Sequence, residues 1–107
     1  MNLSIVAGDD RNYLIEVSDE DGNPIDITGY TFHFRMKERE DQDDEDAVIN
    51  KSWTDHFEPT NGKTLLQLSS SESNIAARDY LFNIWYFNTG GKRTTLEFDS
   101  KMFTVKK

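Results

Sequence analysis

The chain has 107 residues and no cysteine, and its 20 acidic and 12 basic side chains give a net charge of −8. This length fits one domain, residues 1–107, whose hydrophobic core is large enough to fold without disulfides or a structural metal. The lack of cysteine excludes disulfides and thiolate-rich metal sites and suits a reducing cytosol. An acidic chain without a basic stripe binds phosphate groups poorly, so we expect neither nucleic acid nor an anionic membrane surface as a partner.

The N-terminal segment through Tyr13 has no basic n-region and only one short apolar run, Leu3–Val6. We therefore expect no signal peptide, and we count that run as a first short strand. No apolar run in the chain approaches the roughly 18 residues that a membrane-spanning helix needs. The sequence thus predicts no transmembrane segment.

Apolar and polar residues alternate with a period of two along most of the chain, which predicts strands with one buried face. The pattern is cleanest at 30–37 and less regular at 47–54. At 79–87 both faces are apolar, which predicts a central or covered strand. The residues that share a face within their strands are Tyr13, Ile15 and Val17; Tyr30, Phe32, Phe34 and Met36; Leu66 and Leu68; Tyr80, Phe82, Ile84 and Tyr86; and Leu96 and Phe98.

Glycine-containing turn signals separate these strands at Asp21-Gly22, Asn61-Gly62 and Gly90-Gly91. Each is typical of a hairpin. Residues 69–78 are the one helical candidate, of one or two turns at most, and Ser71 is the expected cap. Near the end of the chain the apolar parity reverses, which predicts a bulge or bend at 99–101.

About seven short strands in about 100 residues are typical of an all-β fold, an antiparallel β-sandwich of the immunoglobulin-like kind. A small barrel is the competing architecture. The immunoglobulin cysteine pair is absent, so the prediction concerns the architecture alone.

Two acidic segments invite comparison with metal sites. Asp19, Asp21 and Asn23 are spaced like the first ligands of a calcium loop, but Pro24 stands where that loop needs glycine and Tyr30 where it needs glutamate. We therefore interpret this segment as a turn whose side chains bond the local backbone.

The second acidic segment runs from Glu38 to Asp46 and holds seven acids and one base. Blocks of like charge are usually solvated, so we predict an acidic loop between two strands. Calcium binding by this loop is the alternative that the sequence leaves open, although no regular spacing of ligands supports it.

The sequence contains no catalytic motif. Its two histidines, His33 on the wet face of a strand and His56 in a loop, are not paired by any spacing, and two ligands do not make a zinc site. No nucleophile elbow or phosphate loop is present. We therefore expect a protein that is not an enzyme and that uses no cofactor or metal.

The aromatic residues are the remaining candidates for a site. Trp85 and Phe87 lie on the opposite face of their strand from its core residues. Either another part of the chain covers that face, or Trp85 and Phe87 form a surface that contacts another protein. The alternative function is a carbohydrate-binding module in which Trp53 or Trp85 stacks on sugar rings.

The order of these segments resembles the N-terminal domain of phage baseplate upper proteins and related short phage tail proteins. The resemblance covers nearly the whole chain, and its motifs are short. They are Tyr13 with the strand LIEVSD, DGNPIDITG at 21–29, the alternating strand at 30–37, an acidic insertion before AVINKSWT, NGKTLLQLSSSESNI at 61–75, RDYLFNIWY from Arg78, and a final FTV.

This resemblance implies a structural virion module with an immunoglobulin-like sandwich and no catalytic residues. In the family such domains anchor receptor-binding machinery to the tail tip or baseplate. The implied partners are other phage tail or baseplate proteins, including further copies of the chain. The implied location is the virion of a phage or prophage, assembled in the cytoplasm of the bacterial host. Longer family members continue past the position of Lys107, so we expect either a stand-alone adaptor or decoration protein or a remnant in a prophage.

Overall fold

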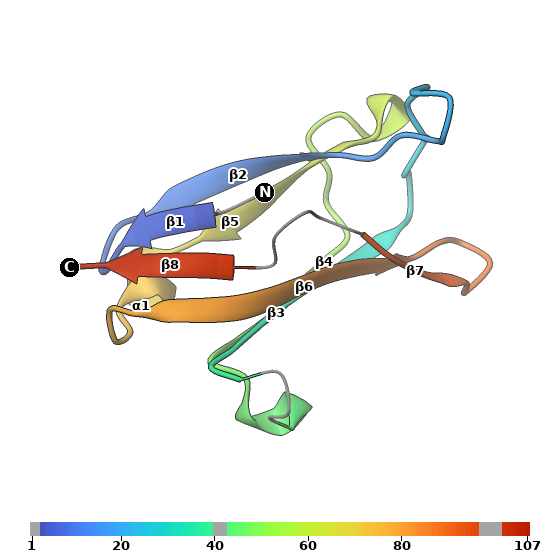
Figure 1. The fold of residues 1–107 in the computed structure, drawn as a ribbon. Helices are drawn as coiled ribbons and strands as arrows, with labels where there is room; N and C mark the ends of the chain where they lie inside the picture. The colour runs from blue at the N-terminus through green and yellow to red at the C-terminus, as the bar shows by residue number, and fades with distance from the viewer. Residues whose placement is uncertain (1–2, 40–42, 97–101) are drawn as a thin grey trace.

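The computed structural model describes residues 3–39, 43–96 and 102–107, and these residues form two β-sheets that face each other (Figure 1). The strands are β1 Leu3–Val6, β2 Arg11–Glu16, β3 Thr31–Lys37, β4 Ile49–Trp53, β5 Lys63–Leu68, β6 Asp79–Phe87, β7 Arg93–Thr95 and β8 Met102–Lys106. Three short helical segments complete the described elements: η1 Asp44–Asp46, η2 Pro59–Asn61 and α1 Ser70–Ser73.

The larger sheet has the order β1-β8-β6-β3-β4, with β7 beside the second half of β6, and the smaller sheet pairs β2 with β5. All pairs are antiparallel except β1 with β8, which run in the same direction from Leu3 beside Phe103 to Val6 beside Lys106. The all-β prediction is thus confirmed. The pairing of β8, β6 and β3 opposite β2 and β5 has the order of strands G, F and C opposite B and E in an immunoglobulin sandwich. Membership of that fold stays a prediction.

The period of two in the sequence matches the observed burial. Phe32, Phe34 and Met36 of β3 have no exposed surface, while the residues between them are partly exposed. The buried side chains of both sheets form one cluster, which Ile27 joins from the loop before β3. Within it, the ring of Phe103 lies 5.8 Å from that of Tyr13 in the opposite sheet. This cluster fixes the separation of the sheets and so the shape of the gap between their edges.

The turn interpretation of the first acidic segment agrees with the observed bonds. The Asp19 side chain accepts hydrogen bonds from the backbone N–H of Asp21 at 3.0 Å and of Asn23 at 2.9 Å. Ser18 and Pro24 face each other across this turn. The carboxylate therefore has a local structural use. The Gly90-Gly91 hairpin is likewise confirmed, because it joins β6 to β7.

The tight turn predicted at Asn61-Gly62 is confirmed, because Glu58 and Lys63 exchange both backbone hydrogen bonds across it. It does not, however, join two neighbouring strands of one sheet. The strands on either side of it, β4 and β5, belong to different sheets, and Asn61 ends the short helix η2. Gly62 has a φ of +71° and follows that helix in a left-handed conformation, with its N–H bonded to the Pro59 carbonyl. The turn closes a single antiparallel bridge at the start of β5, and the segment between Trp53 and Glu58 makes the crossing from one sheet to the other.

The predicted helix cap is also wrong by two residues. Ser69, not Ser71, precedes α1: its hydroxyl accepts from the backbone N–H of Glu72, and the Glu72 carboxylate accepts from the backbone N–H of Ser69. This reciprocal arrangement is a capping box. The strand count differs slightly from about seven, because the last predicted segment divides into β7 and β8. The predicted bulge at 99–101, Phe98 and residues 40–42 of the acidic segment lie outside the described residues.

Candidate functional site

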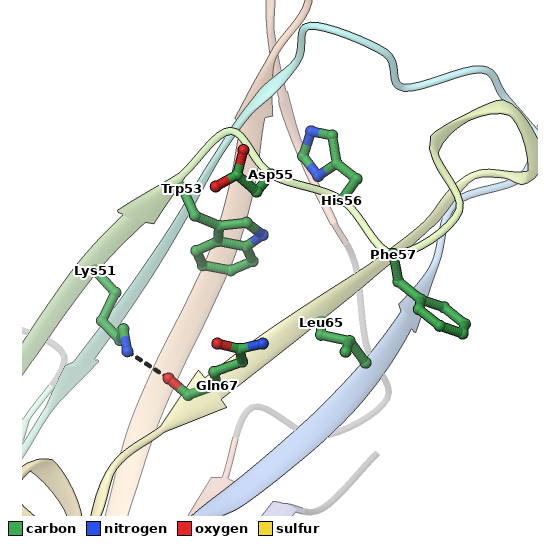
Figure 2. Close-up of a pocket in the computed structure, with 7 residues that line it drawn as sticks. All are labelled: Lys51, Trp53, Asp55, His56, Phe57, Leu65 and Gln67. Atoms are coloured by element: carbon green, nitrogen blue, oxygen red, sulfur yellow. Dashed lines mark hydrogen bonds between the residues drawn. The ribbon is translucent and has the colours of Figure 1, made fainter.

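A pocket of about 390 Å³ opens between the free edge of β4 in the large sheet and that of β5 in the small sheet. Its walls are Lys51 and Trp53 from β4, residues 55–57 from the following loop, and Leu65 and Gln67 from β5 (Figure 2). The pocket exists because the segment between β4 and β5 crosses from one sheet to the other without forming a strand in either. It is therefore a product of the topology.

Trp53 is held in this pocket from two directions. One face of its indole stacks on the core residue Phe32, with ring centroids 5.8 Å apart and planes 26° apart. Its Nε1–H donates to the Thr64 hydroxyl at 2.7 Å. Phe32 occupies one face of the indole, and Trp53 lines the pocket with part of the surface that remains.

His56 completes the same network. Its Nε2 lies 2.8 Å from the Tyr30 carbonyl, which only accepts, so the proton is assigned to Nε2. Its Nδ1 then accepts from the Thr64 hydroxyl at 2.9 Å, and that hydroxyl oxygen in turn accepts from Trp53. Every polar atom in this series of hydrogen bonds, from Trp53 through Thr64 and His56 to Tyr30, thereby has a partner. Burial of the Thr64 hydroxyl requires such partners.

Thr64→Val should lower the free energy of unfolding by about 2 kcal/mol, because it keeps the shape of the side chain but leaves the Trp53 N–H and His56 Nδ1 without a buried partner. Urea unfolding at equilibrium measures this loss. Thr64→Ser keeps the hydroxyl and should cost less than Thr64→Val. Thr95→Val, on an exposed strand, is the matched control and should change stability by no more than about 0.5 kcal/mol. Equal losses for Thr64→Val and Thr95→Val would contradict the network.

Lys51 ties the two edges together at one end of the pocket. Its Nζ donates to the backbone carbonyl of Gln67 and lies 2.8 Å from the Glu72 carboxylate. Burial acts to raise the pKa of Glu72, but the hydrogen bonds from Lys51 and Ser69 outweigh it and hold this pKa below its usual value. The ammonium of Lys51 is therefore engaged, whereas Asp55 and the side chain of Gln67 are exposed at the pocket.

The edge of β5 beside the pocket carries backbone groups that do not pair with β2. Successive residues of an antiparallel strand direct these groups alternately toward the partner and away from it. Lys63 exchanges both of its backbone bonds with Glu58, and the Gln67 carbonyl accepts from Lys51, so the odd-numbered residues of β5 face away from β2. Leu65, between them, therefore directs its N–H and C=O out of the sheet.

An apolar patch of three residues, Leu14, Leu65 and Phe57, adjoins that edge. Leu14 and Leu65 are opposite each other on the outer face of the small sheet, and Leu14 is 47% exposed. Phe57 is 60% exposed and lines the pocket with Leu65 (Figure 2). The strand edge and this patch together form a surface with both hydrogen-bonding and apolar groups.

Trp85 and Phe87 lie on the outer face of the large sheet, as parity predicts, but the indole is only 5% exposed. The guanidinium carbons of Arg35 and Arg93 each lie 4.8 Å from the centroid of the Trp85 ring, and the His33 ring stacks on it at 5.2 Å. The chain thus covers Trp85 itself, largely with two cations. A protein contact at this face stays a prediction, in which the arginines and not the indole would be presented to a partner.

The same cover perturbs His33. Burial, and then the positive charges of Arg35 and Arg93, lower the pKa of its imidazole below the ordinary value. The imidazole of His33 therefore binds a proton more tightly in the unfolded chain than in the folded protein. The contribution of neutral His33 to the free energy of unfolding is complete above the ordinary imidazole pKa. It is lost as pH falls from there through the folded pKa.

Arg93→Ala should raise the pKa of His33 toward its ordinary value, because it removes a nearby positive charge that lies over the neighbouring Trp85 ring. A pH titration of the His33 ring signals by NMR measures this change. Lys92→Ala removes the same charge from the adjacent exposed position and should leave the His33 titration nearly unchanged. A His33 pKa that does not move in Arg93→Ala would show that Arg93 has no influence on it.

The structure does not bring the two histidines together. His33 belongs to the outer face of the large sheet, whereas His56 packs edge-on against Phe32 at the core. In the part of the chain that the structure describes, no cluster of three or more histidine, cysteine, aspartate or glutamate side chains is placed to hold a metal ion. Among the same residues, no helix has the length and apolar character needed to span a bilayer.

Thr64 and the pocket around Trp53 were missed by the sequence interpretation. Thr64 shares the parity of Leu66 and Leu68, so its inward position was available from the pattern. Its two ring partners could not be identified, because Trp53 comes from the other sheet and His56 from the loop that follows β4. Comparison with known proteins adds no assignment, since no protein family model matches the chain and no curated protein matches it.

Proposed function

We propose that the chain is a non-enzymatic structural or adaptor module of a phage or prophage tail or baseplate, and that it acts through contacts with other proteins. The observation that supports this proposal is the outward-directed backbone of Leu65 in the edge of β5, beside the apolar patch of Leu14, Leu65 and Phe57. The resemblance of the ordered sequence motifs to phage tail and baseplate domains supports the choice of partners.

A partner strand added to this edge would gain specific backbone bonds from Leu65 and burial of the adjoining patch. Strand addition of this kind takes its affinity from main-chain hydrogen bonds and its specificity from the side chains beside them. Single contacts of this size are weak, but repetition around a symmetric particle multiplies them. The partners in this proposal are other tail or baseplate proteins and further copies of the chain.

The proposal is tested by particle incorporation of two proline variants. Leu65→Pro removes an N–H that points away from β2, so it blocks the edge while keeping the β2–β5 bonds. Asn12→Pro is the matched control, because Asn12 is opposite Gln67 and its N–H points to the other edge of the same small sheet. Thermal unfolding first verifies that both variants fold.

Phage particles induced from the bacterial strain that carries the gene are then purified and labelled with an antibody against the chain. We expect label at the tail or baseplate for the wild type and for Asn12→Pro, and loss of label for Leu65→Pro. Particles without the chain would overturn the virion assignment. Equal incorporation of both variants would overturn the role of the β5 edge.

A further inference from the structure

We infer that the pocket between β4 and β5 binds a neutral saccharide, with the free face of Trp53 as its stacking platform. This inference does not rest on the proposed virion role, because it concerns the side chains of the pocket and not the backbone edge of β5. It assigns a ligand class to the pocket that Trp53, Asp55 and Gln67 line.

The platform is rigid before any ligand arrives. Trp53 is fixed by Phe32 behind it and by the hydrogen bond from its Nε1 to Thr64 at 2.7 Å. A ring that is already held in place loses little conformational freedom on binding, which favours affinity in a small site. The flat apolar face that remains is complementary to the C–H face of a pyranose ring.

The polar side chains around this ring match hydroxyl groups. Asp55 only accepts hydrogen bonds, and the amide of Gln67 both donates and accepts, so together they complement groups that do both. Figure 2 shows Asp55 above and Gln67 below the Trp53 ring in that view, with Phe57 farther along the rim. Neither Asp55 nor the Gln67 side chain is needed by the fold in the way that Thr64 and His56 are.

The charges around the pocket disfavour ionic ligands. The carboxylate of Asp55 and the net charge of −8 disfavour an anion. The ammonium of Lys51 in the same wall disfavours a cation, and its bond to Glu72 leaves it little capacity to attract an anion. A volume of about 390 Å³ is at the lower end of the roughly 300–1,000 Å³ found for small-molecule sites, which suits one or two sugar rings.

The two tryptophans provide an internal comparison in a single sample. Each indole Nε1–H gives its own signal in a ¹H–¹⁵N NMR spectrum, and Trp53→Phe and Trp85→Phe assign the two signals. The full chain is titrated with glucose, galactose, mannose and N-acetylglucosamine and with disaccharides of them. At least one should shift the Trp53 signal saturably and leave the Trp85 signal in place, because Arg35 and Arg93 cover Trp85. For an open pocket and a ligand of this size we expect a dissociation constant on the order of 1 mM.

Asp55→Asn supplies the second test. It should weaken binding of the sugar that shifts Trp53 by about tenfold, the loss expected for one hydrogen bond to a charged group. Glu16→Gln removes the same charge from an exposed position of β2 outside the pocket and should not change the affinity. Asp55→Asn keeps the β5 edge and the patch of Leu14, Leu65 and Phe57, so it should leave particle incorporation unchanged. Loss of sugar binding and loss of incorporation are therefore separable.

Three results would overturn the inference. The first is no saturable shift with any of these sugars at concentrations on the order of 50 mM, far above the expected dissociation constant. The second is a parallel shift of both indole signals, which indicates a solvent effect. The third is equal affinity of the wild type and Asp55→Asn, which places the sugar elsewhere.

Discussion

Phe103→Ala is expected to lower the free energy of unfolding by about 3–5 kcal/mol, the range for truncating a large aromatic side chain in a packed core. The Phe103 ring has no exposed surface and contacts Tyr13 of the small sheet and Phe34 and Phe82 of the large one, at centroid distances of 5.8, 6.2 and 6.3 Å. Its removal leaves a cavity where the two layers meet. Equilibrium unfolding in urea measures the loss.

Phe57→Ala is the matched control for this substitution. The Phe57 ring is 60% exposed, so the same truncation should change stability by no more than about 0.5 kcal/mol. Comparable losses for Phe103→Ala and Phe57→Ala would contradict the assignment of Phe103 to the interior. A loss at Phe103 below about 1 kcal/mol would contradict it as well.

Gly62→Ala has the second largest expected effect, a loss of about 3 kcal/mol or more. A Cβ at this position would lie 2.3 Å from the Val17 carbonyl oxygen and 2.8 Å from that of Ile25, and the φ of +71° is itself unfavourable for alanine. Both obstacles are backbone atoms, so relief requires the segments themselves to move. The unfolding midpoint in urea, with its slope unchanged, reports the loss.

Gly22→Ala separates the two causes. Gly22 has a φ of +84° and no atom within 4 Å of an added Cβ, so only backbone strain of about 1–2 kcal/mol is expected there. The excess loss at Gly62 measures the close approach of Val17 and Ile25. If Gly62→Ala and Gly22→Ala cost the same, the chain segments around Gly62 are not as closely packed as the structure has them.

The buried faces could be predicted because they depend on local alternation. Phe32, Phe34 and Met36 are inward for the same reason that any period-two strand has a core face, and no knowledge of the partner strands is needed. The cap of α1 could also have been predicted from the sequence. Ser69 stands three residues before Glu72, the spacing of a capping box, and this spacing favours Ser69 over Ser71 in the run of serines.

The site could not be predicted, because it depends on which edges meet. Asn61-Gly62 has the residues of a tight turn and forms one, but these residues do not reveal that the preceding strand, β4, belongs to the other sheet. Trp85 illustrates the same limit. The alternation along β6 indicated that Trp85 lies on the outer face of the sheet. The side chains that cover it, Arg35 on β3 and Arg93 on β7, are placed there by the strand register, which the sequence of β6 does not contain.

The parallel pairing of β1 with β8 has a mechanical consequence. Leu3 begins one strand beside Phe103, and Lys106 ends the other beside Val6, with a further bond from the Ala7 N–H to the Lys106 carbonyl at 2.7 Å. Tension that draws the start of β1 and the end of β8 apart would therefore act along the strands, as Figure 1 makes visible. The bonds between them would be loaded together in shear instead of being peeled open one after another, a geometry that resists pulling force.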